Sequence, residues 1–104
     1  MQTFETIQLT QAKKVTTIWL NKPEVHNAFD EVMVDEITTA FKELGTDIET
    51  RIIVLRAKGK SFSAGADLNW MEKVASYSPE ENLKEAQNLA QCFHMIYSSS
   101  KPTI

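Results

Sequence analysis

The residues with the clearest chemical potential are four small ones in a row, Ser63 to Ala66, which follow an apolar segment and precede a helix-like one. Side chains this small let another molecule approach the main chain closely, and Gly65 tolerates backbone angles that other residues do not. Backbone N–H groups at the start of a helix have no partner within it, so they can hold an anion or polarise a carbonyl oxygen. The run equally fits a tight turn with Asp67 as a helix N-cap, and on the pattern alone this second interpretation is the simpler one.

The other polar candidates do not form a reaction centre on the sequence alone. His26 and His94 share no metal-ligand spacing with Cys92 or with a pair of acidic residues, so we expect no metal site. Cys92 fits a small, half-buried apolar residue better than a nucleophile. Glu81 and Glu85 fit a solvated helix start, where acidic side chains favour the helix dipole. The glycine-rich patterns of dinucleotide-binding and phosphate-binding loops are absent.

The composition excludes several classes of protein. The chain has 104 residues, of which 42% are hydrophobic and 24% charged, enough for one ordinary domain. A formal net charge of −3 gives no electrostatic reason to bind nucleic acid, and a single cysteine fits a reducing compartment. The N-terminus lacks the pattern of a secretory signal, and no run approaches the ~18 apolar residues of a membrane span. We therefore expect a cytoplasmic protein that binds neither nucleic acid nor membrane.

The elements that must position the small-residue run begin with a predicted hairpin. Residues 4–9 and 15–20 read as strands, with the polar residues 11–14 as the turn between them. Asp30 is then a plausible N-cap for a helix that Gly45 weakens near its end. The expected buried face of this helix is Met33, Ile37, Ala40, Phe41, Leu44 and Ile48. Residues 52–55 form an apolar run typical of a strand covered on both faces of a parallel sheet.

After the small-residue run, two more helices are predicted. Asp67 begins a short one, and Ser78 with Glu81 forms a capping box around Pro79 at the start of the next. The apolar face of this last helix is expected to be Leu83, Ala86, Ala90, Phe93 and Tyr97. Residues 102–104 point toward a new extended segment. The element order predicts an α/β fold with a parallel strand–helix–strand unit, and so few strands suggest that residues 1–104 are an incomplete part of a larger domain.

Two segments resemble the signatures of the crotonase (enoyl-CoA hydratase/isomerase) superfamily. They are Leu20-Asn21-Lys22-Pro23-Glu24-Val25-His26-Asn27-Ala28-Phe29, where Lys22 replaces a commoner arginine, and Phe62-Ser63-Ala64-Gly65-Ala66-Asp67-Leu68. The run from Gly65 to Met71, with Tyr77 to Leu83 after it, is most similar to methylglutaconyl-CoA hydratases. The resemblance implies the N-terminal part of a crotonase (ClpP/crotonase-like) fold, an α/β fold of ββα repeats with a mostly parallel sheet.

The resemblance also implies a site, position by position. Ala66 matches the residue whose backbone N–H forms half of an oxyanion hole, which holds the thioester oxygen as it becomes an enolate. Other positions match contacts of the family with coenzyme A: Ala64, Gly65, Asp67 and Leu68 in the second segment, and Val25, His26 and Ala28 in the first. The family's second oxyanion donor, a glycine, and the two glutamates of its hydratases match positions after Ile104.

The implied function is the addition of water across the α,β-double bond of an enoyl-CoA, with no separate cofactor because coenzyme A is part of the substrate. A methylglutaconyl-like substrate from leucine or terpenoid breakdown is the specific expectation, and this chain alone is expected to be inactive. The alternatives are an isomerase of the same superfamily, a non-catalytic CoA-binding or scaffold module, and a plain structural domain. The family also implies a homo-oligomer, a trimer or hexamer, in the complete protein.

Overall fold

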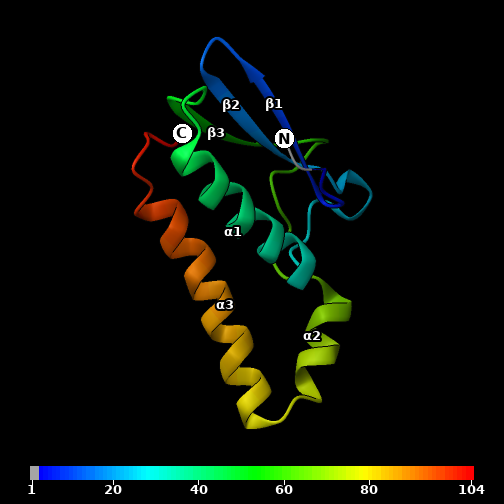
Figure 1. The fold of residues 1–104 in the computed structure, drawn as a ribbon. Coiled ribbons are helices and arrows are strands. Elements are labelled where there is room, and N and C mark those ends of the chain that lie inside the picture. Colours follow the sequence, from blue (N-terminus) through cyan, green and yellow to red (C-terminus); the bar gives the residue numbers. More distant parts are fainter. Residues whose placement is uncertain (1–2) are drawn as a thin grey trace.

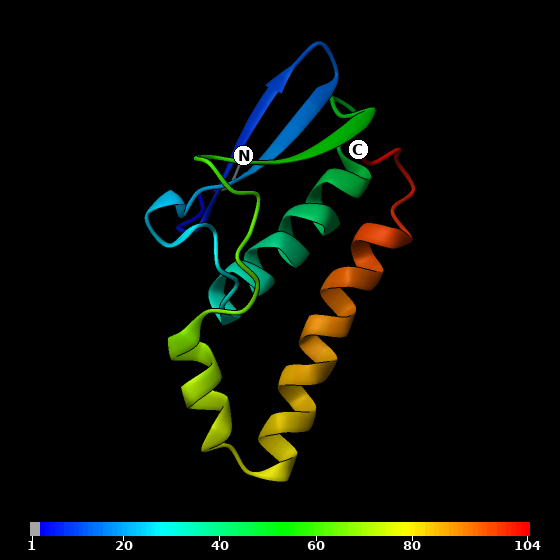
Figure 2. The ribbon, with the colours of Figure 1, turned by 180° about the vertical axis from the view of Figure 1, so that it is seen from behind.

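A computed structural model describes residues 3–104 as a three-stranded sheet with one long helix against its face and a second long helix packed against the first (Figure 1). The elements in chain order are β1 (Ile7–Ala12), β2 (Val15–Leu20), a short 3-10 helix η1 (Pro23–Val25), α1 (Glu31–Thr46), β3 (Ile52–Ala57), α2 (Leu68–Ala75) and α3 (Pro79–Tyr97). Seen from behind, α2 and one end of α3 extend beyond the sheet (Figure 2). The α/β class and the predicted element order are confirmed.

The hairpin between β1 and β2 is confirmed, but the predicted position of its first strand and turn is wrong. The antiparallel ladder runs from the pair Ile7–Leu20 to the pair Ala12–Val15, so the turn is only Lys13 and Lys14. Both lysines lie in the left-handed region, with φ of 52° and 68°. The polar residue Gln11 belongs to the strand because its side-chain amide donates to Thr16 and to Asp47, Glu49 and Thr50 beyond α1.

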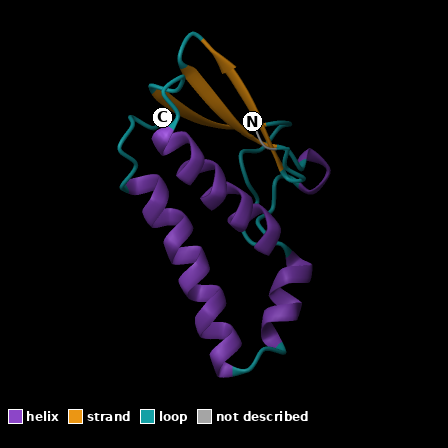
Figure 3. Cartoon of the chain, viewed as in Figure 1, coloured by secondary structure: helices purple, strands orange, loops and turns teal. Residues whose placement is uncertain are grey.

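A parallel ladder joins β2 to β3, with α1 as the connection between them (Figure 3). Because side chains alternate along a strand, Ile18, Leu20 and Ile53 point to the face covered by α1 and are fully buried. Val54 points to the other face and is only partly buried, so the strand expected to be covered on both faces is covered well on one. The parallel strand–helix–strand unit is confirmed.

The first long helix begins as predicted and buries the predicted face, with one exception. The Asp30 carboxylate accepts from the Met33 N–H at 2.9 Å and caps α1. Ile48 is 85% exposed because α1 ends at Thr46, before the next turn would carry it inward. Gly45 does not end the helix early. The buried side chains of α1 are Met33, Val34, Ile37, Ala40, Phe41 and Leu44.

The capping box of α3 is confirmed, and the predicted apolar face of this helix is exposed and does not pack against α1. Ser78 Oγ accepts from the Glu81 N–H at 3.2 Å, and the Glu81 carboxylate accepts from the Ser78 N–H at 3.0 Å. The residues of this face are all exposed: Leu83, Ala86, Ala90, Phe93 and Tyr97. Two apolar stripes run along this helix, and α1 packs against the other one, which contains Leu89, Cys92 and Ile96. Cys92 is only 2% exposed, more deeply buried than predicted.

The extended segment predicted at the end of the chain is confirmed. Ile53 N–H donates to Pro102 O and Ile104 N–H donates to Ile53 O, each at 3.0 Å, in a parallel bridge centred on Thr103. The Lys101 ammonium, held by the carbonyls of Leu44 and Asp47, fixes this segment to the C-terminal end of α1. Residues 102–104 therefore begin a strand beside β3. Across residues 3–104, no helix combines the length and the hydropathy needed to cross a bilayer.

Candidate functional site

Two loops that are distant in the sequence lie side by side in the structure. The first loop, residues 22–29, leads into α1, and the second loop, residues 58–67, connects β3 to α2. Ala64 N–H donates to His26 O at 2.9 Å, and Phe29 N–H donates to Gly65 O at 2.6 Å. Asp67 N–H donates to Phe29 O, also at 2.6 Å. The two sequence segments that carry the predicted site therefore form one surface.

The backbone amide of Ala66 is directed away from this contact. Ala66 forms an isolated parallel bridge with Phe29, whose N–H and carbonyl bond to the residues on either side of Ala66 rather than to Ala66 itself. In a parallel bridge the central residue's own N–H and carbonyl point to the opposite side. Within residues 3–104 the Ala66 N–H donates to no acceptor, and the residue is exposed. This amide is available to a molecule bound from outside.

Gly65 supplies the bend that presents the amide. Its φ is +91°, a value that residues with a side chain rarely adopt, and nothing lies within 4 Å of where a Cβ would stand. The backbone angle, not crowding, therefore requires glycine here. Ser63 supports the bend: its hydroxyl accepts from Gly65 N–H at 3.1 Å and donates to the Asn27 carbonyl at 2.9 Å.

An apolar cavity of about 430 Å³ begins at Ala66 and continues between α2 and α3. Apart from the polar Asn82 and Glu85, its wall is apolar or aromatic, contributed by Ala66, Trp70, Met71, Val74, Ala75, Ala86 and Leu89. Glu85 is not simply solvated, as the sequence suggested, because its carboxylate accepts from Trp70 Nε1 at 3.3 Å and it is partly buried. An unpaired amide thus borders a space suited to an apolar group.

The other predicted site residues surround this point in different ways. Val25 is 40% exposed and Leu68 is 76% exposed, so both can contact a ligand, as can the exposed Ala64 and His26. Ala28 is buried, and its N–H donates to Val25 O within the first loop. The carboxylate of Asp67 accepts from Trp70 N–H at 3.0 Å, so this residue does cap α2, as the simpler interpretation held.

An ion pair closes the first loop. Lys22 Nζ lies 2.9 Å from Asp30 Oδ2, and both side chains are largely buried. Partial burial alone would raise the pKa of Asp30, but the hydrogen bond from Met33 N–H and the charge and hydrogen bond of Lys22 outweigh it and lower that pKa. The carboxylate is therefore charged at neutral pH. Lys22 keeps the positive charge of the commoner arginine and is directed to the loop, not to the Ala66 amide.

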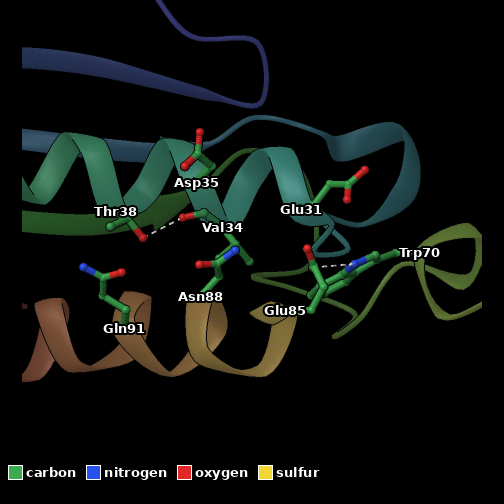
Figure 4. A pocket seen from close by; sticks show the side chains of 8 residues that line it. All are labelled: Glu31, Val34, Asp35, Thr38, Trp70, Glu85, Asn88 and Gln91. Atoms are coloured by element: carbon green, nitrogen blue, oxygen red, sulfur yellow. Dashed lines mark hydrogen bonds between the residues drawn. The ribbon is translucent and has the colours of Figure 1, made fainter. Parts of the chain in front are cut away.

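A second, smaller pocket holds acidic side chains but does not include Ala66. It has a volume of about 60 Å³, and Figure 4 shows Glu31, Asp35 and Glu85 around it, between α1 and α3. The Glu31 carboxylate also pairs with Lys73 Nζ at 2.7 Å. No three His, Cys, Asp or Glu side chains gather closely enough to hold a metal ion anywhere in the part of the chain that the structure describes.

Sequence reasoning missed one residue of the site, Asn27. Its side chain is fully buried and bonds to both loops. The residue type itself could have indicated this position. Asparagine is one of the few residues that adopt the left-handed backbone region readily, and it stands in a loop directly after His26. Both residues have positive φ, 53° and 54°.

The structure is that of an α/β protein in which two loops meet beside the sheet. Comparison with protein families gives the class: residues 10–104 match the family described as enoyl-CoA hydratase/isomerase. The chain belongs to the enoyl-CoA hydratase/isomerase family, and its structure is the N-terminal part of the crotonase fold, with a mixed sheet.

Individual proteins agree with this assignment. A Thermus thermophilus protein described as an enoyl-CoA hydratase is 38% identical over 90 residues, which are 86% of this chain and 36% of that protein. The crystal structure of an enoyl-CoA hydratase from Shewanella pealeana matches 96% of this chain and 38% of its own, with 39% identity and a TM-score of 0.94. An enoyl-CoA hydratase/isomerase from Marinobacter aquaeolei matches 94% of this chain and 39% of its own, with 31% identity and a TM-score of 0.87. The chain thus spans little more than a third of the length of these proteins.

Proposed function

We propose that this chain is the acyl-CoA-binding part of an enoyl-CoA hydratase, an enzyme that adds water across the α,β-double bond of an enoyl-CoA. The observation that carries the proposal is the Ala66 N–H, which has no acceptor within residues 3–104 and belongs to a residue that lines an apolar cavity. The family supports a coenzyme A thioester as the substrate class.

In the proposed mechanism, the Ala66 amide donates to the thioester oxygen. Negative charge accumulates on this oxygen as water adds and the enolate forms, so a fixed donor stabilises the transition state more than the substrate. One such donor typically contributes roughly 10²–10³ in rate. Because Phe29 bonds to both neighbours of Ala66, the donor is held in place before the substrate arrives.

The second donor is proposed to be a glycine amide that follows Ile104. Residues 102–104 run parallel to β3, and Leu55 N–H donates to Ile104 O at 2.8 Å. A strand continued in this direction advances toward Ala57, from which the second loop emerges. The direction of the segment supports a second donor at the same edge of the sheet as Ala66.

The coenzyme A part of the substrate is proposed to bind across the two loops. Ala64, Gly65, Asp67 and Leu68 would contact it from the second loop and the start of α2, and the exposed Val25 and His26 from the first loop. Ala28, the third first-loop position that the family implies, is buried. The exposure of Ala64 and Gly65, whose side chains are minimal, supports close approach to the main chain. No separate cofactor is needed, because coenzyme A enters as part of the substrate.

The acyl group is proposed to enter the cavity between α2 and α3. A branched, apolar acyl chain fits its wall. A methylglutaconyl group is the narrower proposal, and its terminal carboxylate needs a cation. The cavity wall has Glu85 and no cationic side chain. A comparison of methylglutaconyl-CoA with an uncharged branched enoyl-CoA therefore tests this narrower proposal directly.

The glutamates that activate water and protonate the α-carbon are proposed to follow Ile104, so residues 1–104 alone would not catalyse hydration. In agreement, Glu31 is paired with Lys73, and Glu81 is bound in the capping box of α3. The acidic residues after Ile104 also decide between hydration and isomerisation. A non-catalytic CoA-binding module remains the alternative from a different class, and tight CoA binding by residues 1–104 alone would favour it.

We also propose that the complete protein is a homo-oligomer, a trimer or hexamer. The exposed apolar stripe on α3, which includes Leu83, Phe93 and Tyr97, supports burial against further protein. Measuring the mass of the complete protein by light scattering tests this, and a monomer would contradict it.

The central test removes the Ala66 N–H. In the complete protein, Ala66→Pro deletes the donor, and Ala66→Ser keeps it at nearly the same size. We expect Ala66→Pro to lower kcat for enoyl-CoA hydration by about 10²–10³-fold, with a much smaller change for Ala66→Ser. Circular dichroism confirms that both variants are folded. Equal activity of the folded proline variant and the unchanged protein would overturn the mechanism. Hydration by residues 1–104 alone would overturn the proposal that the glutamates follow Ile104.

A further inference from the structure

We infer that Asn27 is a positioning residue, whose side chain locks the first loop onto the second and so fixes the direction of the Ala66 N–H. The inference rests on the proposed function. It adds a residue that acts on the loops and not on the substrate.

The side chain of Asn27 is fully buried and uses every hydrogen-bonding group it has. Its Oδ1 accepts from Lys22 N–H at 2.8 Å, at the start of the first loop. Its Nδ2 donates to Lys58 O at 2.8 Å and to Ser61 O at 3.0 Å, both in the second loop. An aspartate offers no donor for those two carbonyls at neutral pH, and an alanine offers nothing, so only the amide satisfies all three groups.

The backbone of Asn27 extends the same connection. Its φ of +54° lies in the left-handed region, which asparagine tolerates better than most residues. In this conformation its N–H donates to Lys22 O at 2.9 Å, and its carbonyl accepts from the Ser63 hydroxyl at 2.9 Å. That hydroxyl in turn accepts from Gly65 N–H. Hydrogen bonds thus lead without a break from Asn27 to the residue before Ala66.

Two residues after Asn27, Phe29 completes the support by bonding to Gly65 and Asp67 on either side of Ala66. Phe29 lies in the first loop, so its position depends on that loop. Asn27 holds the loop at its start and also against the second loop. A displacement of about 1 Å at a positioned group can lower a rate by about 10²-fold. Loss of the Asn27 amide is therefore expected to weaken catalysis although this residue touches no substrate atom.

The experiment compares three changes in the complete protein. Asn27→Asp keeps the acceptor for Lys22 N–H but places a carboxylate against two carbonyls. Ser63→Ala is the milder change, because it removes only the hydroxyl that links the Asn27 carbonyl to the Gly65 N–H, at a partly exposed position. Thr16→Val is the matched control, because Thr16 is also fully buried and bonds to Thr50 at 2.6 Å, but at the other end of β2 from the loops. Each variant is assayed for kcat, KM and melting temperature.

A positioning role predicts that kcat falls at least about tenfold for Asn27→Asp, with a smaller fall for Ser63→Ala and less than a threefold change in KM for either. Thr16→Val should lower the melting temperature without changing kcat per folded molecule. Unchanged kcat in folded Asn27→Asp would overturn the inference and leave Asn27 a stabilising residue only.

A second readout keeps this inference separate from the proposed function. If the unchanged protein hydrates no enoyl-CoA, the proposed function fails, and the amide signal of Ala66 in an NMR spectrum still reports the loop geometry. Asn27→Asp should shift that signal clearly more than Thr16→Val does. Equal shifts in the two variants would overturn the positioning role whatever the activity of the protein.

Discussion

Lys22 and Asp30 form an ion pair that joins the beginning of the first loop to the N-cap of α1, with 2.9 Å between Nζ and Oδ2. Only 15% and 28% of the two side-chain surfaces are exposed. The pair therefore connects the first loop to the N-terminus of α1, and its loss is expected to destabilise both.

Replacing the charge of Asp30 should change the pH dependence of stability. The pKa of Asp30 is lowered in the folded state, so ionised Asp30 favours folding above its ordinary pKa of 3.8, and this contribution is lost as the pH falls through the lowered folded value. Asp30→Asn keeps a good N-cap and removes the charge. The variant should be less stable than the unchanged chain in urea unfolding at about pH 7, and the difference should shrink below about pH 4. Asp35→Asn, on the exposed side of α1, is the control.

The three glycines should respond differently to alanine. Gly45 has an ordinary helical backbone with open space around it, so Gly45→Ala should raise stability by about 0.5–1 kcal/mol. Gly65 has positive φ and open space, so Gly65→Ala should cost about 1–3 kcal/mol from backbone strain alone. Gly59→Ala should cost more, because its Cβ would also lie 2.9 Å from Pro23 Cβ. Chemical unfolding of the three variants gives the order of their stabilities. A smaller loss of unfolding free energy for Gly59→Ala than for Gly65→Ala would contradict it.

The thiol of Cys92 should be unreactive in the folded protein. Burial raises the pKa of this thiol, more than its hydrogen bond with Thr38 lowers it, and the side chain is 2% exposed. Labelling with a thiol-specific reagent near pH 8 should be at least about tenfold slower than in urea-unfolded protein. Labelling at the same rate in both states would show that α3 does not pack on α1 as described.

Residues 1–104 should self-associate through the exposed stripe of α3. Phe93 is 50% exposed and Leu83 is 61% exposed, and both are large apolar side chains. Light scattering should give a mass above that of a monomer at high concentration, and Phe93→Glu should lower it. Gln8→Glu adds the same charge at an exposed position of β1 and should have little effect. Equal masses for the two variants would exclude the stripe as the cause.

The sequence predicted the elements whose signals are local. The capping box at Ser78 and the N-caps at Asp30 and Asp67 each depend on residues within one helical turn, and all three are present. The shared surface of the two loops was implied by the family resemblance. Nothing local shows it, because the hydrogen bond from Ser63 to Asn27 joins residues 36 positions apart.

Two cases show where local pattern is insufficient. The helix from Pro79 to Tyr97 has two apolar stripes, and the position of α1 decides which is buried, so the local pattern identified only the stripe that stays exposed. The turn of the hairpin was placed too early, because Gln11 is polar but belongs to a strand when its amide has partners beyond α1. In both cases tertiary contacts outweighed local preference.

The tight turn at Lys13 and Lys14 offers a route to engineer a more robust protein. Both residues adopt positive φ, which the Asn-Gly pair of a two-residue hairpin accepts at much lower cost than two lysines. The ion pair of Lys14 with Glu49 is well exposed, and such pairs contribute little. Replacing Lys13 and Lys14 by Asn and Gly should therefore stabilise the hairpin, at the end of the sheet opposite the loops. The more stable protein would tolerate more substitutions in the acyl cavity.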